Sequence, residues 1–302
     1  MYDFLSEQQI QTFLTEGALT IRQALSPKFV AEHVRRTWAR LGMDEQDRDT
    51  WHLRYLNLPT MNDFEFETHA PRAGAAVCDL LGGLDRINPP FTFHDNHIIN
   101  LIDPDQTWQP PGPDCPGWHK DGDWFRHYLD SPEQAILCII FWSDIKPGGG
   151  GTIYSPDSVK HIVEFLRDHP EGVDPALLHR TKQMDDIIHQ CSDFREATGD
   201  AGDVTFLHPF TLHTSSVNSR PEARIISNAC VSLIEPMNFK RENPADHSAI
   251  EQAVLNAVDV DRFDFRIAGP RQRITPQRHE QWNPIRREHD RNLQGAGLPI
   301  KV

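Results

Sequence analysis

The stretch Ala-Ile-Leu-Cys-Ile-Ile-Phe-Trp at residues 135–142 predicts a buried β-strand. It is a short apolar run rich in β-branched and aromatic residues, and polar or turn-forming residues bound it on both sides. Further segments of this kind lie on both sides of it in the chain: residues 91–93, 98–102, 202–207 and 224–233. A set of short strands bounded by Pro, Gly and Asp favours a β-sandwich or barrel over an alternating βαβ fold.

Helical patterns surround these strands. Residues 4–16 and 26–42 carry apolar side chains at three- and four-residue spacing, and Ser6, Ser26-Pro27 and Gly42 are suitable caps. Further helices are expected at residues 70–84, 158–168, 173–196 and 245–258. The fold class is therefore mainly β with flanking helices (α+β).

We expect one domain over residues 1–235, with a helical part at 1–88 and a β core at 89–235. Residues 236–302 then form a C-terminal helix and a basic tail that pack on the core. Residues 262–302 contain nine Lys or Arg and four Asp or Glu, a balance of +5 in a chain whose net charge is −14. Such a tail could dock on the acidic body, contact a second subunit in a homodimer, or bind an anionic substrate.

Composition excludes several classes of protein. The strongly negative net charge argues against a nucleic-acid binder, and no apolar run is long enough to cross a membrane. The five cysteines are scattered, without a C-x-x-C pair, so a disulfide framework or a zinc ribbon is not expected. The N-terminus lacks the features of a signal peptide. We therefore expect a cytoplasmic protein whose partner is a small molecule.

The chemistry is indicated by three ionisable residues and one arginine. His119 and Asp121 are two positions apart, so an extended backbone places both side chains on one side. Together with a distant histidine they form the ligand set of a 2-His-1-carboxylate site, which typically holds Fe(II) and leaves coordination positions open. His213 is the preferred third ligand and His208 the alternative, because Arg224 follows His213 at eleven residues and could clamp a carboxylate.

With His119-x-Asp121, His213, Ser215, Asn218 and Arg224 in this order, residues 5–235 resemble the phytanoyl-CoA dioxygenase family. Those proteins are Fe(II)- and 2-oxoglutarate-dependent oxygenases with a double-stranded β-helix, a jelly-roll or cupin-like fold. The similarity includes the turn segment 142–152. It breaks at Tyr154-Ser155-Pro156-Asp157-Ser158, where family members usually have Pro-Gly-Ser-His.

The resemblance implies specific roles. His119, Asp121 and His213 would be the catalytic iron ligands, and Arg224 would bind the distal carboxylate of 2-oxoglutarate. Thr152 is a second candidate for contact with this co-substrate. The implied reaction uses O2, releases succinate and CO2, and hydroxylates or otherwise oxidises a C–H bond of a small molecule, such as a secondary metabolite or an acyl ester. An intact Asp121 argues against halogenation.

Two other functions stay open at this point. The chain could be a metal enzyme on a cupin-like barrel that uses Zn(II) or Mn(II) and no 2-oxoacid, because divalent metals compete for similar sites. It could also be a non-catalytic binding protein. The four glycines at 148–151 are expected to form a tight turn, since no Gly-Lys-Ser/Thr follows to make a phosphate loop.

Overall fold

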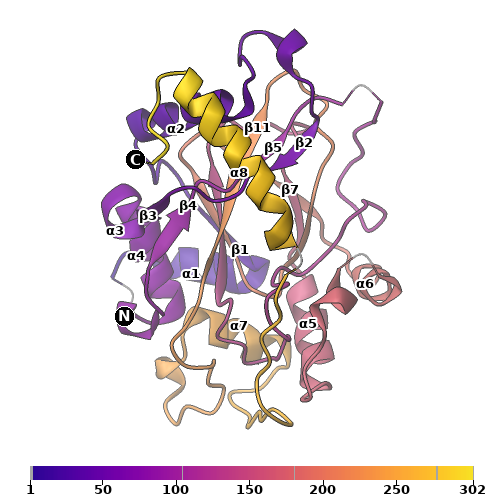
Figure 1. Cartoon of the computed structure of the whole chain (residues 1–302). Coiled ribbons are helices and arrows are strands. Elements are labelled where there is room, and N and C mark those ends of the chain that lie inside the picture. The colour runs from indigo at the N-terminus through magenta and orange to yellow at the C-terminus, as the bar shows by residue number, and fades with distance from the viewer. Residues whose placement is uncertain (1–2, 104, 180, 277, 302) are drawn as a thin grey trace.

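The structure, a computed structural model, describes residues 3–103, 105–179, 181–276 and 278–301. The side chains of residues 278–283 are left out of the description. Within these ranges no helix has both the length and the apolar character needed to cross a membrane. Two antiparallel sheets face each other at the centre, and helices cover the outside (Figure 1).

The first two helices lie where the sequence predicts, although α1 begins at Glu7 and not at residue 4. α1 (Glu7–Glu16) starts with a capping box between Ser6 and Gln9, and α2 (Pro27–Leu41) is capped by the Ser26 side chain. Both end at a glycine in the left-handed region, Gly17 and Gly42. Phe29 of α2 packs against Trp142 at a ring-centroid distance of 5.8 Å, so this helix lies against the outer face of the central strands.

The large sheet has the order β1-β9-β6-β11-β5-β2, and all of its pairs are antiparallel. Its strands are β1 (Ala18–Ile21), β9 (Val204–Leu207), β6 (Ile136–Phe141), β11 (Arg224–Val231), β5 (His97–Asn100) and β2 (Tyr55–Asn57). The predicted strand at 135–142 is confirmed as the fully buried β6. The edge strands β1 and β2 come from the N-terminal part, for which the sequence indicated only helices.

A smaller sheet of order β10-β7-β8 packs against the inner face of the large one. Its strands are β10 (Leu212–Ser215), β7 (Thr152–Ser155) and β8 (Arg195–Ala197). Tyr154 and Ala197 of this sheet share a buried cluster with Leu137, Ile139 and Phe141 of β6. The alternation of side chains along each strand therefore directs one set of residues into the space between the two sheets.

The remaining elements lie around the sheets: β3 (Asp63–Glu65), β4 (Thr92–His94), α3 (Phe66–His69), α4 (Pro71–Leu81), α5 (Ser158–Arg167), α6 (Lys182–Ile188), α7 (Ala249–Ala257), α8 (Arg278–Gly295), and the 3-10 turns Arg48–Thr50, Leu84–Arg86, Pro175–Leu178 and Pro244–Asp246. One predicted helix, 173–196, is wrong over most of its length. Only α6 is α-helical there. Pro175 opens a short 3-10 turn, and residues 195–197 pair with β7 as β8.

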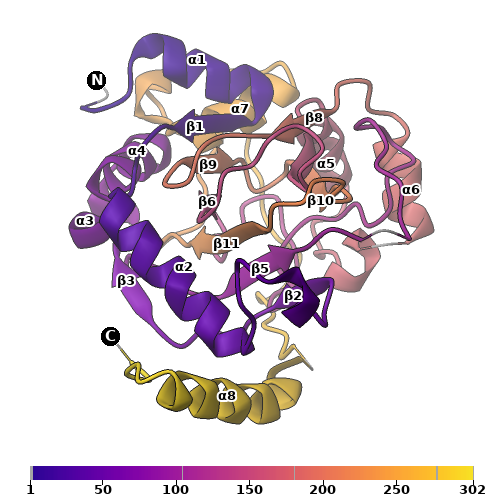
Figure 2. The same ribbon diagram turned by 90° about the horizontal axis from the view of Figure 1, so that it is seen from above.

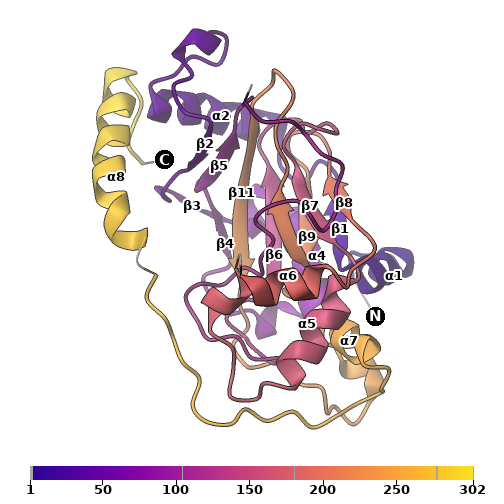
Figure 3. The same ribbon diagram turned by 90° about the vertical axis from the view of Figure 1, so that its right-hand side faces the viewer.

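The C-terminal segment runs outside the sheets. α7 packs against α1 and α5, whereas α8 packs against α2 (Figure 2). Between them, residues 258–276 pass along the outside of the protein to reach α8 (Figure 3). This segment donates a hydrogen bond from Ile274 N to Trp124 O, and Arg126 N donates one to Gln272 O. The segment thus runs beside residues 124–126, close in sequence to the His119–Asp121 motif.

Candidate metal centre

His119 and His213 are brought together by the backbone. The N–H of each donates to the carbonyl of the other, both at 3.1 Å, which forms an isolated antiparallel bridge at the start of β10. Directly opposed residues of such a bridge carry their side chains on the same face. The two imidazole rings therefore lie side by side, with centroids 4.5 Å apart.

Asp121 completes the cluster. Its carboxylate oxygens lie 3.4 Å from Nε2 of His119 and 3.4 Å from Nε2 of His213. One ligand atom from each residue lies within 4.8 Å of the other two. A divalent metal with bonds of about 2.1 Å to three atoms on one octahedral face separates those atoms by about 3 Å. The spacing in the structure suits such a metal.

Hydrogen bonds fix the tautomer of both histidines. Nδ1 of His119 lies 2.8 Å from the carbonyl oxygen of Gly117, and Nδ1 of His213 lies 3.1 Å from that of Thr211. Because a carbonyl only accepts, each Nδ1 carries the proton and each Nε2 presents a lone pair toward Asp121. Nε2 of His213 is buried without a hydrogen-bond partner in the described residues, as expected for an atom that binds a metal.

The carboxylate is held in its charged form. Burial would raise the pKa of Asp121, but when no metal is bound and Nε2 of His213 and of His119 carries a proton, the charges and hydrogen bonds of these rings outweigh burial and hold that pKa well below its usual range. Asp121 and His119 keep about a quarter of their side-chain surface exposed, 23% and 24%. The site thus combines an anionic ligand with access for small molecules.

His208, the alternative third ligand, does not reach this site. Its Nε2 bonds the carbonyl oxygen of Ile250 at 3.1 Å, and its Nδ1 accepts from the N–H of Phe210 at 3.2 Å. Both ring nitrogens therefore have hydrogen-bond partners within the protein, and neither is available to bind a metal. Burial lowers its pKa to about 3, so the ring stays neutral in the core.

Arg224 is a buried cation at the start of β11, on the inner face of the large sheet. Its guanidinium donates to the carbonyls of Gly150 and Ile98 and to the hydroxyl of Ser215. No carboxylate in the described part of the chain lies within ion-pairing distance of it. Burial, opposed by Tyr55 and Glu196, lowers its pKa. A buried guanidinium without an anion is costly, so the arrangement suits an anionic ligand.

Thr152 lies near Arg224. It is directly opposite Ser215 in the β7–β10 register and is buried. Its hydroxyl makes no hydrogen bond with the rest of the described chain. Ser215, a member of the motif that carries the family resemblance, contacts Arg224 at 3.2 Å and the hydroxyl of Tyr55 at 3.1 Å.

Tyr55 was not found from the sequence, because β2 is three residues long and carries no motif. Asn218 does stabilise the turn after β10, since it bonds Asn100 O, Glu222 O and Arg220 N. The glycine turn is confirmed as well. Gly148 and Gly150 have φ of 74° and 77°, and Gly149 N donates to Lys146 O.

Three further residues near the His119–Asp121 motif or the central strands make contacts that stabilise the fold. Trp142 packs on the outer face against Phe29 and donates to Ser227, so it does not line the metal centre. Trp118 packs against Phe194. Lys120 is buried, with Nζ 2.8 Å from His127 Nδ1, and burial lowers its pKa to about 7 against the opposing charges of Asp121, Cys230 and Glu133.

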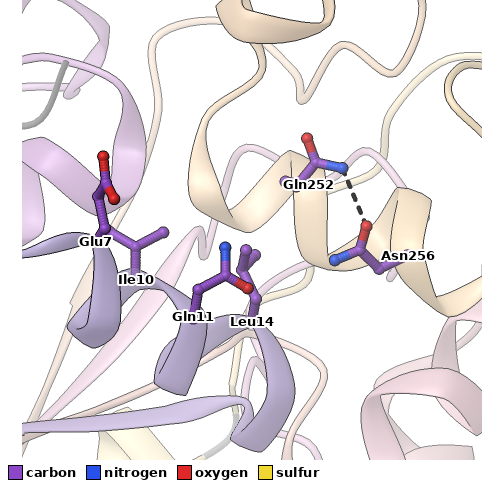
Figure 4. A pocket seen from close by; sticks show the side chains of 6 residues that line it. All are labelled: Glu7, Ile10, Gln11, Leu14, Gln252 and Asn256. Carbon is purple, nitrogen blue, oxygen red and sulfur yellow. Dashed lines mark hydrogen bonds between the residues drawn. The ribbon is translucent and has the colours of Figure 1, made fainter.

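A surface groove lies between α1 and α7 (Figure 4). It is lined by Glu7, Ile10, Gln11, Leu14, Gln252 and Asn256. The amide of Gln252 donates to that of Asn256 across one side. Nothing in its lining marks a ligand, and we assign it no role.

Comparison with known proteins gives a limited result. No family model and no curated protein matches the chain. Among solved structures, it is similar to the non-heme alpha ketoglutarate dependent epimerase SnoN from nogalamycin biosynthesis, at 16% identity, over 74% of this chain and 81% of that chain, with a TM-score of 0.43. It is also similar to EctD from S. alaskensis with 2-oxoglutarate and 5-hydroxyectoine, at 14% identity, over 76% of each chain, with a TM-score of 0.41.

A third similar structure is HygX from Streptomyces hygroscopicus with nickel, 2-oxoglutarate and hygromycin B. It shares 14% identity over 76% of this chain and 87% of that chain, with a TM-score of 0.43. At these TM-scores and identities, structural similarity determines neither the family nor the activity. The site itself is a candidate mononuclear metal centre, with two histidines and one carboxylate as its ligands.

Proposed function

We propose that the protein is an Fe(II)- and 2-oxoglutarate-dependent dioxygenase that oxidises a C–H bond of a small molecule. The proposal rests on two sites that lie between the same two sheets. His119, Asp121 and His213 form a three-ligand metal site, and the buried Arg224 lacks an anionic partner in the described chain. The facing sheets would then be a double-stranded β-helix, with residues 1–235 as the oxygenase domain and 236–302 packed on it.

Each residue has a defined task in this proposal. Nε2 of His119, Nε2 of His213 and one oxygen of Asp121 would hold Fe(II) on one face. Arg224 would bind the distal carboxylate of 2-oxoglutarate, and its bonds to Gly150 and Ile98 fix the direction of the guanidinium. Ser215, Tyr55 and Thr152 would supply hydroxyl groups beside that carboxylate. The buried residues between the sheets would exclude bulk water from the reacting groups.

When bound, the iron would couple the O2-dependent decarboxylation of 2-oxoglutarate, with release of succinate and CO2, to oxidation of the substrate. Hydroxylation is the simplest outcome. The residues described do not distinguish it from desaturation, epoxidation or ring formation.

Each of the two alternative functions leaves one feature of the site without a purpose. A zinc or manganese enzyme on a cupin-like barrel would have no use for a buried, unpaired guanidinium near the metal. A non-catalytic binding protein would have no reason to keep both Nε2 atoms directed at one carboxylate. Retention of both features in one chain favours the oxygenase.

The proposal is tested by calorimetric titration of 2-oxoglutarate into protein loaded with Zn(II), which binds the same ligands without reacting with O2. We expect binding only when the metal is present, and no binding of glutarate, which lacks the 2-oxo group needed for chelation. In Arg224→Lys, the affinity should fall at least tenfold, or about 1.4 kcal/mol, because an ammonium cannot replace a bidentate guanidinium. Equal binding of both acids would contradict the proposed function.

A further inference from the structure

Lys120 is a buried cation that lies between the ligands His119 and Asp121 in the sequence. Its Nζ lies 5.3 Å from the ring centroid of Phe125 and 5.7 Å from that of Phe210, and no carboxylate in the described part of the chain forms an ion pair with it. A buried ammonium without a carboxylate partner is unfavourable for folding. Packing alone therefore does not explain a lysine at this position.

The ammonium of Lys120 holds the backbone beside the carboxylate ligand. Nζ donates to the carbonyl oxygen of Asp121 at 3.2 Å, and it lies 2.8 Å from Nδ1 of His127. The next residue, Gly122, has φ of 115° and lies so close to the His127 ring that an added Cβ would be 2.8 Å from Cε1. Lys120 and His127 thus fix the turn from which the Asp121 side chain reaches the metal site.

His127 belongs to residues 124–128, which lie between two other parts of the chain and which we call the bracing segment. On one side, His127 and Val173 exchange backbone hydrogen bonds of 2.9 Å and 2.8 Å. On the other side, the N–H of Arg126 donates to the carbonyl oxygen of Gln272 at 3.0 Å. Successive N–H groups of an extended segment point in opposite directions, so the bracing segment is the middle one of three extended pieces.

The outer piece is the C-terminal strap, residues 268–274, which is part of the stretch that leads to α8 (Figure 3). Ile274 donates to the bracing segment through its N–H at 2.8 Å. The guanidinium of Arg271 pairs with Asp130 at 2.6 Å and lies 5.3 Å from the centroid of the Tyr128 ring. All strap residues except Arg271 and Ile274 are exposed, so few contacts hold the strap in place, and it should open more easily than the sheets.

We propose that Lys120 and His127 are positioning residues for the ligand Asp121, and that they couple docking of the C-terminal strap to metal binding. The contacts form a continuous path from the strap to the bracing segment, from His127 to Lys120, and from Lys120 to the backbone of Asp121. A bound metal then stabilises the docked strap, and the docked strap strengthens metal binding by the same factor. The coupling rests on the metal site of the proposed function, but it does not require the reaction with 2-oxoglutarate and O2.

Hydrogen exchange of the wild type, with and without one equivalent of Zn(II), tests the coupling. The amides of the strap and of the bracing segment, such as those of Ile274 and Arg126, should exchange about fivefold more slowly when Zn(II) is bound. α7 precedes the strap in the chain but packs against α1 and α5, so its amides should exchange at the same rate in both states. Equal exchange of the strap amides with and without bound Zn(II) would overturn the proposal.

Lys120→Met separates a positioning role from a structural one. Met fills a similar volume, and the contacts that are lost are offset by the removal of a buried charge, so the melting temperature should change little. The affinity for Zn(II), measured by competition with a chelator, should fall about tenfold. The slower exchange of the strap amides on Zn(II) binding should disappear. Unchanged affinity for Zn(II) in this variant would overturn the proposal, whatever its melting temperature.

Arg271→Ala changes the strap and leaves the metal ligands and Lys120 in place. Without the ion pair to Asp130 the strap should open more often, and the affinity for Zn(II) should fall about fivefold, because the coupling is reciprocal. Arg266→Ala is the matched charge control, since the Arg266 side chain is 81% exposed and pairs with Asp264 in the same stretch. This control should bind Zn(II) like the wild type. If Arg271→Ala also does so, the proposal is wrong.

The outcomes also distinguish the coupling from the proposed function. If the wild type does not bind Zn(II), the metal site is wrong and both proposals fall. If Zn(II) and then 2-oxoglutarate bind while the exchange of the strap amides is unchanged, the oxygenase stands and the coupling is wrong. If Zn(II) slows the exchange of the strap amides but 2-oxoglutarate does not bind, the coupling stands and the proposed function is wrong.

Discussion

Arg224 of the large sheet donates a hydrogen bond to Ser215 of the small sheet, at 3.2 Å. Ser215 is two residues beyond the candidate ligand His213, so this contact connects the metal centre with the only cation that the proposal assigns to the co-substrate. Tyr55 reaches the same hydroxyl from β2. The strands β2, β10 and β11 therefore converge on the position that the proposal assigns to the co-substrate carboxylate.

The hydroxyl groups beside Arg224 should strengthen co-substrate binding. Tyr55→Phe removes the partner of Ser215, and Ser215→Ala removes a contact of the guanidinium itself. We expect each change to weaken 2-oxoglutarate binding about threefold to tenfold, the size of one hydrogen bond. Calorimetry on the Zn(II)-loaded variants measures this. Unchanged affinity in both variants would place the co-substrate elsewhere.

Removal of a metal ligand should abolish tight metal binding. Asp121→Ala leaves two neutral imidazoles, and His213→Ala leaves one imidazole and the carboxylate. Competition with a chelator for Fe(II) under anaerobic conditions should show at least a hundredfold loss of affinity in each variant, since a ligand is lost outright. His52→Ala, at an exposed histidine outside the site, should bind like the wild type. Retained Fe(II) binding or retained turnover in Asp121→Ala would exclude Asp121 as a ligand.

The turn after Asp121 should tolerate only glycine. Gly122 has φ of 115°, and a Cβ atom there would lie 2.5 Å from Phe125 Cε1 and 2.8 Å from His127 Cε1. Gly122→Ala should therefore lower both the melting temperature and the affinity for Fe(II). At Gly112, the nearest atom to an added Cβ is 3.9 Å away, so Gly112→Ala is the matched control. If the two variants have the same melting temperature and the same affinity for Fe(II), the turn does not require glycine at position 122.

The C-terminal segment should contribute to stability through Glu251. Burial would raise the pKa of this carboxyl, but Arg241, Arg86 and the N–H of Asn238 outweigh it and lower the pKa from 4.5 to about 2. A depressed pKa in the folded state contributes stability above pH 4.5, and this contribution is lost as the pH falls toward 2.

We expect Glu251→Gln to lower the free energy of unfolding at pH 7 by about 3 kcal/mol. The difference from the wild type should shrink below pH 4.5, where the wild-type carboxyl begins to lose its advantage. Urea denaturation of both proteins at pH 7 and pH 3.5 measures this. A difference that is constant with pH would show that the carboxylate charge does not stabilise the fold.

The sequence was sufficient for elements with strong local signals. β6 is an uninterrupted apolar run, and α1 and α2 carry capping residues at both ends, so local chemistry defines them. β8, by contrast, has three residues and is held by its pairing with β7, so periodicity predicted a helix there. α8 was not recognised as a helix within the basic tail, because it contains Pro284, which disfavours a helix in the sequence, and because it packs against the distant α2.

The residues of the candidate site also fall into two groups: those that the sequence predicts and those that it does not. His119, Asp121, His213 and Arg224 belong to a spaced motif that can be read from the chain. Tyr55 carries no motif, and it contacts Ser215 only because β2 joins the edge of the large sheet. The choice between His208 and His213 likewise needed the structure, because only the hydrogen bonds of His208 show that its ring is engaged elsewhere.

The central claim is that a metal bound by His119, Asp121 and His213 is chelated by 2-oxoglutarate held by Arg224. It is tested most directly by the visible spectrum of the protein with Fe(II) and 2-oxoglutarate in the absence of O2. We predict a weak charge-transfer band that is absent in His213→Ala and needs a higher 2-oxoglutarate concentration in Arg224→Lys. No band in the wild type under conditions where Fe(II) is bound would contradict the account.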